Sequence, residues 1–443
     1  MKPLLILGGR LIDPNRGIDE TGNLLITEGK ISAQGKEEIT ALPSDCEVLS
    51  AEGLIVCPGF IDLHCHLREP GFTEKETIAT GTRAAAQGGF TTICCMPNTN
   101  PPLDNIETIK YVKSKANQEG VVRVLPIGCI SRGQKGGDLA PLSELASAGV
   151  IGFSDDGEPV SNSPLMRRAL ESSRKLELPI IDHCEDKSLA AGGVMNEGTV
   201  STKVGLPGIP ASAEESMVAR DLQLAGATGG WLHVAHVSTA GSVELIRRAK
   251  EKGIHVTAEV TPHHLTLTEA MVQICGSNAK VNPPLRTSAD TQALLQGLME
   301  GTIDVIATDH APHTRANKQG DFITAAFGIS GLETALAALL TLVHEGKLDL
   351  VTLVSRLTAA PARIIGNKHG RLGTLAVGAP ADVTIFDPNK EWIVDPDNFV
   401  SKGKNTPWGG FALKGKVMAT IYQGKMVYKD NSIRIAEWDK VIK

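Results

Sequence analysis

Two histidines separated by one residue, His64 and His66, stand at the end of a short apolar run that begins at Phe60. If this run is a β-strand, alternate side chains share a face, so both imidazoles point to the same side. Two imidazoles at that spacing can bind one metal ion. Arg68 follows, where its guanidinium can hold a carboxylate through two hydrogen bonds. A half-buried strand with incidental histidines would look the same, so the elements around this run must distinguish the two readings.

Apolar, Val/Ile-rich runs alternate with helix-like stretches through the middle of the chain. This alternation indicates parallel strands buried on both faces. Eight such repeats favour an α/β fold of the (β/α)8 TIM-like barrel type over an open sheet. An open sheet would be favoured by a Gly-x-Gly-x-x-Gly loop after the first strand, and none follows it. The expected strands cover residues 60–64, 90–96, 121–129, 150–154, 179–183, 231–236, 254–260 and 303–308.

Both ends of the chain are β-rich and differ from the middle. Residues 4–12, 23–32 and 46–56 read as strands near the start, with a hairpin turn at Glu28-Gly29-Lys30. Residues 381–386 and 416–427 have the same character near the end. We therefore expect one small β-domain built from both termini, residues 1–58 and 372–443, around a barrel of residues 59–371.

Polar residues concentrate at the carboxyl ends of the expected strands. In a barrel these ends meet at one face, where active sites are built. Histidines and carboxylates buried together there need a counter-charge, which a divalent metal supplies. Strand alternation does not choose between Asp155 and Asp156, because the strand is already ending there. The side chains expected at this face are His64, His66, Asn98, Asp155, Asp156, His183, His236 and Asp309.

The remaining histidines and two cysteines are expected to be structural. His233 should face away from His236 on its strand, and Cys65 away from its two neighbours. His263 and His264 could approach the site, although structural roles are favoured for both. No role is assigned to Glu185 or Asp186, which follow His183.

Composition narrows the functional classes. The 443 residues carry a formal net charge of −6, with 42% hydrophobic and 21% charged residues, as in ordinary soluble globular proteins. There is no basic stripe to bind nucleic acid, and no apolar run approaches the roughly 20 residues of a membrane span. The eight cysteines include no Cys-x-x-Cys spacing, which favours reduced thiols and a cytoplasmic location.

Several motifs together resemble those of dihydroorotases of the larger bacterial class, within the amidohydrolase superfamily. The likeness spans essentially the whole chain, including the β-rich ends. The motifs that carry it are His64-Cys65-His66-Leu67-Arg68-Glu69-Pro70-Gly71, Met96-Pro97-Asn98-Thr99, Asp182-His183-Cys184-Glu185-Asp186, His236-Val237-Ser238-Thr239, Val281-Asn282-Pro283-Pro284-Leu285-Arg286, Thr308-Asp309-His310-Ala311-Pro312-His313 and Phe327-Gly328-Ile329.

The resemblance implies a barrel with a terminal β-sandwich and a zinc site. Of the Asp155-Asp156 pair it selects Asp156, by its spacing to His183. Many amidohydrolases carry a carboxylated lysine at the end of strand 4, and none stands there in this chain, so one Zn2+ is expected and a second stays open. The implied metal residues are His64, His66, Asp156, His183, His236 and Asp309. The implied substrate contacts are Arg68, Asn98, Asn282 and His313, with the backbone around Phe327 and Gly328 closing the pocket.

The implied reaction is the reversible cyclisation of N-carbamoyl-L-aspartate to dihydroorotate with loss of water, a step of pyrimidine synthesis. Asp309 is expected to move the proton. The likeness also implies a homo-oligomer, such as a dimer, and an association with aspartate carbamoyltransferase. The alternatives are another cyclic-amide hydrolase, a hydantoinase or allantoinase, and an inactive scaffold. Residues 314–322 form either a lid over the substrate or an ordinary surface loop.

Overall fold

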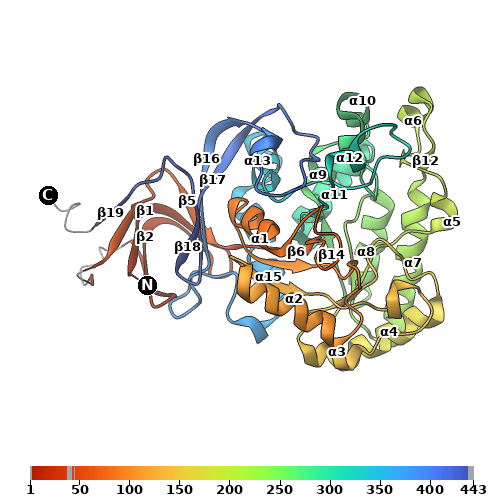
Figure 1. Ribbon diagram of the computed structural model, residues 1–443, viewed down its shortest axis with the longest axis horizontal. Helices are drawn as coiled ribbons and strands as arrows, with labels where there is room; N and C mark the ends of the chain where they lie inside the picture. The colour runs from red at the N-terminus through yellow and green to blue at the C-terminus, as the bar shows by residue number, and fades with distance from the viewer. Residues whose placement is uncertain (1, 37–41, 44, 438–443) are drawn as a thin grey trace.

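Eight short parallel strands, ringed by helices, form the larger part of the computed structural model, which describes residues 2–36, 42–43 and 45–437 (Figure 1). They pair in the orders β6-β7-β8 and β9-β10-β13-β14-β15. Single bridges between Gly128 and Phe153 and between Cys65 and His310 join the two sheets, so the order closes on itself. The strands are β6 (Phe60–Cys65), β7 (Phe90–Cys95), β8 (Arg123–Pro126), β9 (Phe153–Ser154), β10 (Ile180–Asp182), β13 (Leu232–Val234), β14 (Val256–Val260) and β15 (Val305–Ile306).

Most of these strands are shorter than their apolar runs suggested. The run over residues 303–308 yields only β15, and the run over 121–129 only β8. The chain leaves the ladder where backbone geometry changes: His236 and Asp309, just after β13 and β15, have φ of 30° and 44°. Apolar patterning marks the buried segment and not the point at which hydrogen bonding stops, so the predicted ends were too long.

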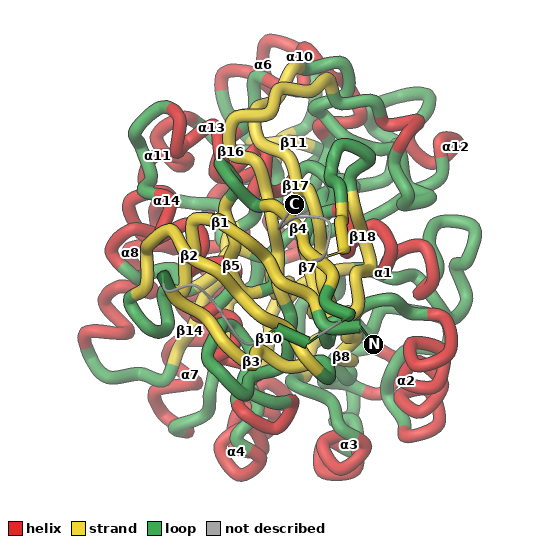
Figure 2. Tube along the Cα trace, turned by 90° about the vertical axis from the view of Figure 1, so that its left-hand side faces the viewer, coloured by secondary structure: helices red, strands yellow, loops and turns green. Residues whose placement is uncertain are grey.

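A helix follows most of these strands and packs its apolar stripe inward. In α4, the buried residues Leu165, Met166, Ala169 and Leu170 recur at helical spacing. Figure 2 shows the helices as a rim around the strands. The long helices are α1 (Ile78–Gln87), α2 (Ile106–Glu119), α3 (Leu142–Ala148), α4 (Ser163–Leu176), α7 (Ala211–Thr228), α8 (Ala240–Glu251), α11 (Ser288–Glu300), α13 (Ala335–His344), α14 (Leu350–Leu357) and α15 (Ala359–Ile365).

Some helical segments have no counterpart in the sequence-based expectations. After α13 the chain forms α14 and α15 where no further helix was predicted. The connections after the strands also contain short helices, too brief to show a helical period. These are α5 (Lys187–Ala190), α6 (Thr199–Val204), α9 (Pro262–Thr266), α10 (Met271–Cys275) and α12 (Arg315–Lys318). A further small pair, β11 (Met195–Asn196) and β12 (Gly208–Ile209), lies in the same region of the chain.

Both ends of the described chain build one nine-stranded sheet (Figures 1 and 2). Its main path is β18-β17-β16-β5-β1-β2-β3, and β4 joins β1 and β19 beside it. The antiparallel pairing of β5 with β16 connects the N-terminal and C-terminal parts. The strands are β1 (Leu4–Asp13), β2 (Ile18–Thr27), β3 (Lys30–Gly35), β4 (Glu47–Ser50), β5 (Ile55–Pro58), β16 (Val383–Ile393), β17 (Ala412–Tyr422), β18 (Lys425–Lys429) and β19 (Ile435–Glu437).

The connection between β16 and β17, residues 394–411, reaches away from this sheet onto the helical part. There the amides of Val400 and Ser401 donate to Glu333 at 2.7 and 3.2 Å. Asn405 accepts a hydrogen bond from the amide of His313 at 3.0 Å. Residues 372–443 were expected to form part of the β-domain, and this connection within them contacts the loops that follow β15.

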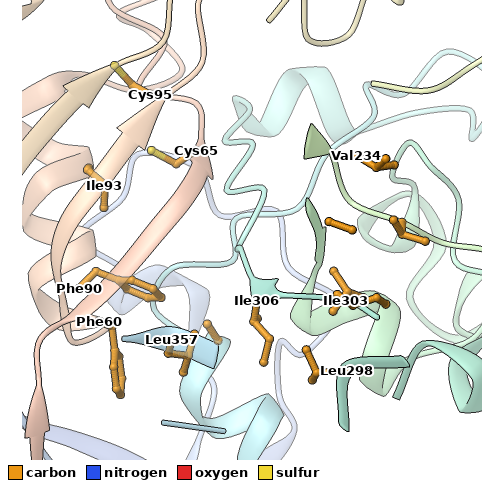
Figure 3. Packing of buried hydrophobic residues seen from close by; sticks show 14 of the residues in the cluster. Phe60, Cys65, Phe90, Ile93, Cys95, Val234, Leu298, Ile303, Ile306 and Leu357 are labelled. Atoms are coloured by element: carbon orange, nitrogen blue, oxygen red, sulfur yellow. The ribbon is translucent and has the colours of Figure 1, made fainter. Parts of the chain in front are cut away.

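Three buried phenylalanines join the parallel strands to the terminal sheet. The Phe60 ring of β6 lies 5.7 Å from Phe90 of β7, edge to face, and 6.1 Å from Phe386 of β16. Figure 3 shows Phe60 and Phe90 side by side among the buried apolar residues. Within the described residues, no helix is long and apolar enough to cross a membrane.

We expect Phe60→Ala to lower the free energy of unfolding by about 3–5 kcal/mol, because it removes both ring contacts and leaves a cavity. Urea denaturation monitored by fluorescence or circular dichroism measures the change. Val377→Ala, at a side chain that is 56% exposed, is the control and should change stability by less than about 0.5 kcal/mol. A loss below about 1 kcal/mol for Phe60→Ala would show that this ring does not couple the two sheets.

Candidate active site

Four imidazoles and two carboxylates meet where the parallel strands end. His66 Nε2 lies 3.0 Å from Asp309 Oδ1, and His64 Nε2 lies 3.5 Å from the same oxygen. Asp156 Oδ1 lies 3.4 Å from His64 Nε2, 3.7 Å from His236 Nε2 and 3.8 Å from His183 Nδ1. All six side chains are almost fully buried. We call these residues, His64, His66, Asp156, His183, His236 and Asp309, the His/Asp cluster.

The buried atoms of this cluster lack ordinary hydrogen-bond partners. Among the described residues, His64 Nε2 and Asp156 Oδ1 are buried and have no hydrogen bond. His183 Nδ1 and His236 Nε2 lie 2.8 Å apart. Two imidazole lone pairs at that distance repel each other unless a proton or a cation lies beside them. The donor set of imidazole nitrogens and carboxylate oxygens therefore fits a divalent metal such as Zn2+.

The outward nitrogens of three imidazoles are held by partners, which leaves the other nitrogen of each ring for the cluster. His64 Nδ1 lies 2.6 Å from Glu259 Oε1, and His66 Nδ1 lies 2.9 Å from Asn98 Oδ1. His183 Nε2 lies 3.2 Å from Glu185 Oε2. A neutral ring that donates its proton to this outward oxygen presents the lone pair of its other nitrogen to a metal in the cluster.

Glu259 is the functional residue that sequence reasoning missed. It stands on β14, also accepts from His233 Nε2 at 3.2 Å, and is fully buried. Burial raises the pKa of its carboxyl, but the adjacent His64 and His233 more than offset this, and the net pKa lies below its ordinary value. The sequence did contain a signal for this role. Glu259 stands in a Val/Ala-rich run that was expected to be a buried strand, and a lone buried carboxylate requires a partner.

The two aspartates are held as carboxylates. Burial would raise the pKa of Asp309, but the charge of His64 and the hydrogen bond and charge of His66 more than offset it, so its pKa lies below the ordinary value. Burial would likewise raise the pKa of Asp156, but the charge of His64 and the hydrogen bond with His236 more than offset it, so this pKa also lies below its ordinary value. Ionised carboxylates can bind a cation and can accept a proton.

Two overlapping sets of ligand atoms lie within 4.8 Å of one another: His64 with Asp156 and His236, and His64 with His66 and Asp309. The two sets share His64 and therefore describe adjoining positions for a metal ion.

Backbone strain is concentrated at the same site. Arg68, His236 and Asp309 adopt positive φ of 60°, 30° and 44°. A non-glycine residue in this region costs about 1–3 kcal/mol and persists where surrounding contacts hold it. Such residues cluster at functional sites, and here each one lines the same pocket.

A pocket of about 250 Å³ opens beside the cluster and brings together all of the predicted substrate contacts. Arg68 donates from Nε to Pro312 O at 3.3 Å, and none of the described carboxylates lies within ion-pair distance of it. His313 Nε2 donates to Phe327 O at 2.8 Å. Burial and the charge of Arg68 lower the pKa of His313 to about 2, so its imidazole is neutral. The predicted contacts in the lining are Arg68, Asn98, Asn282, His313, Phe327 and Gly328.

Asn98 and Asn282 also touch the cluster itself. Asn98 Nδ2 donates to Asp156 Oδ2 at 3.3 Å in addition to its contact with His66. Asn282 Nδ2 donates to Glu185, next to His183. Glu185, to which no role was assigned, therefore links a pocket residue to an imidazole. Burial raises its pKa, but His183 and Asn282 bring the net pKa down to about 2.

The other residues weighed for the site lie apart from the cluster or behind it. Asp155 accepts from the amides of Ile130 and Ser131 at 2.9 and 3.1 Å, so it supports a loop while Asp156 joins the cluster. His264 bridges Thr261 and Pro283 O. The other such residues are His233, His263, Cys65 and Cys184, all buried, and Asp186, which caps α5.

The chain is similar to known proteins over nearly its full length. A family described as dihydro-orotase-like matches residues 53–242, and the amidohydrolase family matches residues 201–428. A dihydroorotase of Syntrophus aciditrophicus is 51% identical over 97% of this chain and 100% of its own length. A dihydroorotase of Pelotomaculum thermopropionicum is 53% identical, again over 97% of this chain and 100% of its own length.

Solved structures share the fold at lower identity. An L-hydantoinase (dihydropyrimidinase) from Arthrobacter aurescens superposes with a TM-score of 0.87 at 27% identity, over 99% of this chain and 98% of its own. A D-hydantoinase from a Thermus species gives a TM-score of 0.81 at 25% identity, over 98% and 97%.

We expect Glu259→Gln to weaken metal binding by about 10–100-fold, because the amide orients His64 but no longer supplies a charge to its ring. Competition with a chromophoric chelator measures the dissociation constant for Zn2+. Glu251→Gln, at an exposed carboxylate ending α8, is the matched control and should bind Zn2+ as the unmodified protein does. Equal affinity in the two variants would remove Glu259 from the site.

Proposed function

The chain belongs to the dihydroorotase family of the amidohydrolases, and on that premise we propose that it interconverts N-carbamoyl-L-aspartate and dihydroorotate plus water, in pyrimidine synthesis. It is a metal-dependent cyclic-amide hydrolase, as its relatives and its amidohydrolase match indicate. The direction toward dihydroorotate closes a ring by forming an amide, and the reverse direction hydrolyses that amide.

The closed order of eight parallel strands supports the (β/α)8 barrel expected from the sequence. We assign residues 59–371 to this barrel, and residues 1–58 and 372–443 to a β-sandwich domain. The residues of the His/Asp cluster lie at the ends of the strands or just beyond them, and this is the face that carries active sites in such barrels.

One observation carries the substrate assignment: the guanidinium of Arg68, which has no carboxylate partner among the described residues, lines the pocket beside the His/Asp cluster. An unpaired cation in a largely buried pocket is stabilised by an anionic ligand. Dihydroorotate carries both groups that the pocket requires, a carboxylate for Arg68 and a cyclic amide for the cluster.

A divalent metal, proposed to be zinc, would be held by the His/Asp cluster as one ion or two, where it would supply Lewis acidity toward the amide carbonyl and a water molecule. Glu259, Asn98 and Glu185 orient three of the imidazoles for this purpose. The hydrophobic strands around the cluster limit the access of bulk water.

Asp309 is the proposed proton carrier. Its carboxylate is ionised and lies at the end of the eighth strand, lining the pocket. In hydrolysis it accepts a proton from the attacking water. It then donates that proton to the ring nitrogen as the C–N bond breaks, which yields a carboxyl group and the ureido nitrogen. The second proton of the water leaves the carboxyl group for solvent, which gives the carboxylate. In the reverse direction it takes the proton from that nitrogen during ring closure.

Arg68 and Asn98 are the proposed hydrogen-bond donors to the α-carboxylate, and His313, whose Nε2 hydrogen is donated to Phe327 O, lines the pocket beside them. Holding this group fixes the β-carboxyl and the ureido nitrogen near each other, so ring closure becomes a positioned intramolecular step. Arg68 supplies the charge, and its hydrogen bond to Pro312 O orients the guanidinium. The backbone around Phe327 and Gly328 bounds the far side of the pocket.

A hydantoinase or allantoinase is the nearest alternative, and the hydantoinase structures share the fold. Their substrates offer Arg68 no ring carboxylate. The end of β9 also lacks the lysine that many amidohydrolases carry, and identity to the dihydroorotases is about twice as high. An inactive scaffold is disfavoured because all six residues of the cluster are present and adjacent.

The proposed setting of the enzyme is the cytoplasm, as a homo-oligomer such as a dimer that associates with aspartate carbamoyltransferase. The cysteines support a reducing compartment, since all eight are free thiols. Size-exclusion chromatography with light scattering tests the assembly.

We expect Asp309→Asn to lower kcat for dihydroorotate hydrolysis by at least about 100-fold, because the amide cannot accept the proton. Absorbance of dihydroorotate reports the rate, and elemental analysis of the same preparation reports the metal. A variant with intact metal content and near-normal turnover would exclude Asp309 as the proton carrier.

We expect Arg68→Met to raise KM for dihydroorotate about tenfold or more with a smaller effect on kcat, because it removes a charge-assisted contact made in both bound states. Steady-state kinetics on metal-loaded protein provides the measurement. Arg167→Met, at an exposed ion pair on α4, is the control and should leave KM unchanged. An unchanged KM in Arg68→Met would contradict the carboxylate contact.

A further inference from the structure

A buried lysine, Lys318, lies behind the pocket wall. Its ammonium donates to three backbone carbonyls: Lys280 O at 3.1 Å, Ala326 O at 2.9 Å and Gly328 O at 3.0 Å. Lys318 is only 5% exposed, at the end of α12 within the segment 314–322. None of the carboxylates in the described chain forms an ion pair with it. The three carbonyls are therefore its recorded partners.

These carbonyls belong to two different walls of the substrate pocket. Lys280 immediately precedes Val281 and Asn282, which line one wall, and Gly328 lies on the other with Phe327. The two walls also touch directly, through the amide of Gly328 and Lys280 O at 3.0 Å. One ammonium thus ties together two segments that are more than forty residues apart in the sequence.

The groups facing Lys318 are mostly cationic or neutral. Lys280 directs its own ammonium to Phe322 O and Ile323 O and lies 4.3 Å from the Phe327 ring centroid. The charge of Asp321 favours the protonated form of Lys280 and so acts to raise its pKa, and His313 is neutral. Arg315 and Lys404 line the adjoining cavity together with Asp397, which pairs with Arg315. Burial, and then the charge of Lys280, lower the pKa of Lys318 to about 7.

We propose that Lys318 is a positioning residue for the proposed dihydroorotate site: its ammonium form holds the Phe327–Gly328 wall against the Asn282 wall, and loss of its proton loosens that wall and weakens substrate binding. An ammonium has three N–H donors for the three carbonyls. The neutral amine has two donors and a lone pair, and the lone pair would face a carbonyl oxygen. The inference rests on the proposed function, because it concerns the same pocket.

A second, neutral contact keeps the wall attached when Lys318 loses its proton. Asn405 Nδ2 donates to Gly328 O and to Ala311 O, both at 3.0 Å. Its Oδ1 accepts from the amide of His313. Asparagine does not titrate, so this part of the wall is independent of pH. Deprotonation of Lys318 should therefore change substrate affinity without unfolding the site.

Kinetics as a function of pH tests the proposal. In the unmodified enzyme, KM for dihydroorotate should rise by about tenfold as the pH increases through about 7, because Lys318 then loses its charge-assisted contacts with the three carbonyls. The substrate carboxylate and Arg68 keep their charges across this range, so neither produces such a rise. Changes in proton transfer at the cluster appear in kcat, which separates them from the effect on KM.

Three variants separate this role from a purely structural one. Lys318→Met should show, at every pH, the high KM that the unmodified enzyme has above pH 7. Lys318→Arg should have a lower KM than Lys318→Met, and this KM should not depend on pH near 7, because a guanidinium stays protonated. Arg315→Gln, on the same helix but 62% exposed at its side chain, should retain the unmodified profile. A KM that stays flat through pH 7 in the unmodified enzyme, or that still rises in Lys318→Met, overturns the proposal.

Hydrogen–deuterium exchange gives a readout that does not need activity. The amide of Gly328 should exchange faster in Lys318→Met than in the unmodified protein or in Arg315→Gln, while peptides of β6 and β14 stay protected. If the unmodified protein does not hydrolyse dihydroorotate, the proposed function fails. Exchange at Gly328 still tests whether Lys318 holds the Phe327–Gly328 wall against the Asn282 wall. Equal exchange at Gly328 in all three proteins overturns the role of Lys318.

Discussion

Burial of two carboxylates and four imidazoles at one point is the constraint on which the rest of this structure depends. Ionised groups removed from water are unstable unless they are paired or bind a metal. Several of the distances between their imidazole nitrogens and carboxylate oxygens, from 3.4 to 3.8 Å, are longer than conventional hydrogen bonds and suit ligands around a shared cation. The surrounding structure serves this arrangement, since Glu259, Asn98 and Glu185 each fix one imidazole from behind.

The closed order of parallel strands is what makes such a cluster possible. Parallel strands bring their carboxyl ends to one side, so side chains from five different strands or strand ends can meet although they are distant in sequence. Apolar residues fill the remaining volume, and the three-ring contact of Phe60, Phe90 and Phe386 couples the barrel strands to the terminal sheet. The terminal sheet in turn supplies residues 394–411, whose Asn405 supports His313 and Gly328.

Sequence patterns located the parallel strands because each lies within a continuous apolar run. They did not locate α12 or α5, because a helix of four residues is too short to show a period. Of the candidate residues, the His64-x-His66 pair was placed on one face by strand alternation, and the polar ends of the other expected strands then favoured a metal site. Asp156 could not be separated from Asp155 by alternation, since both follow β9 directly, and only the family resemblance selected it.

The sequence by itself determined which chemical groups are available: the imidazoles, the carboxylates, the guanidinium of Arg68 and the apolar strands that bury them. Only the tertiary structure decided how they are used. It sent Asp155 to the Ile130–Ser131 loop and Asp156 into the cluster. It placed Glu259 behind His64, and it brought Lys318 and Asn405 to the same carbonyl of Gly328. The physical reason is that periodicity and spacing report local burial, whereas hydrogen bonds between residues far apart in sequence depend on how the strands close.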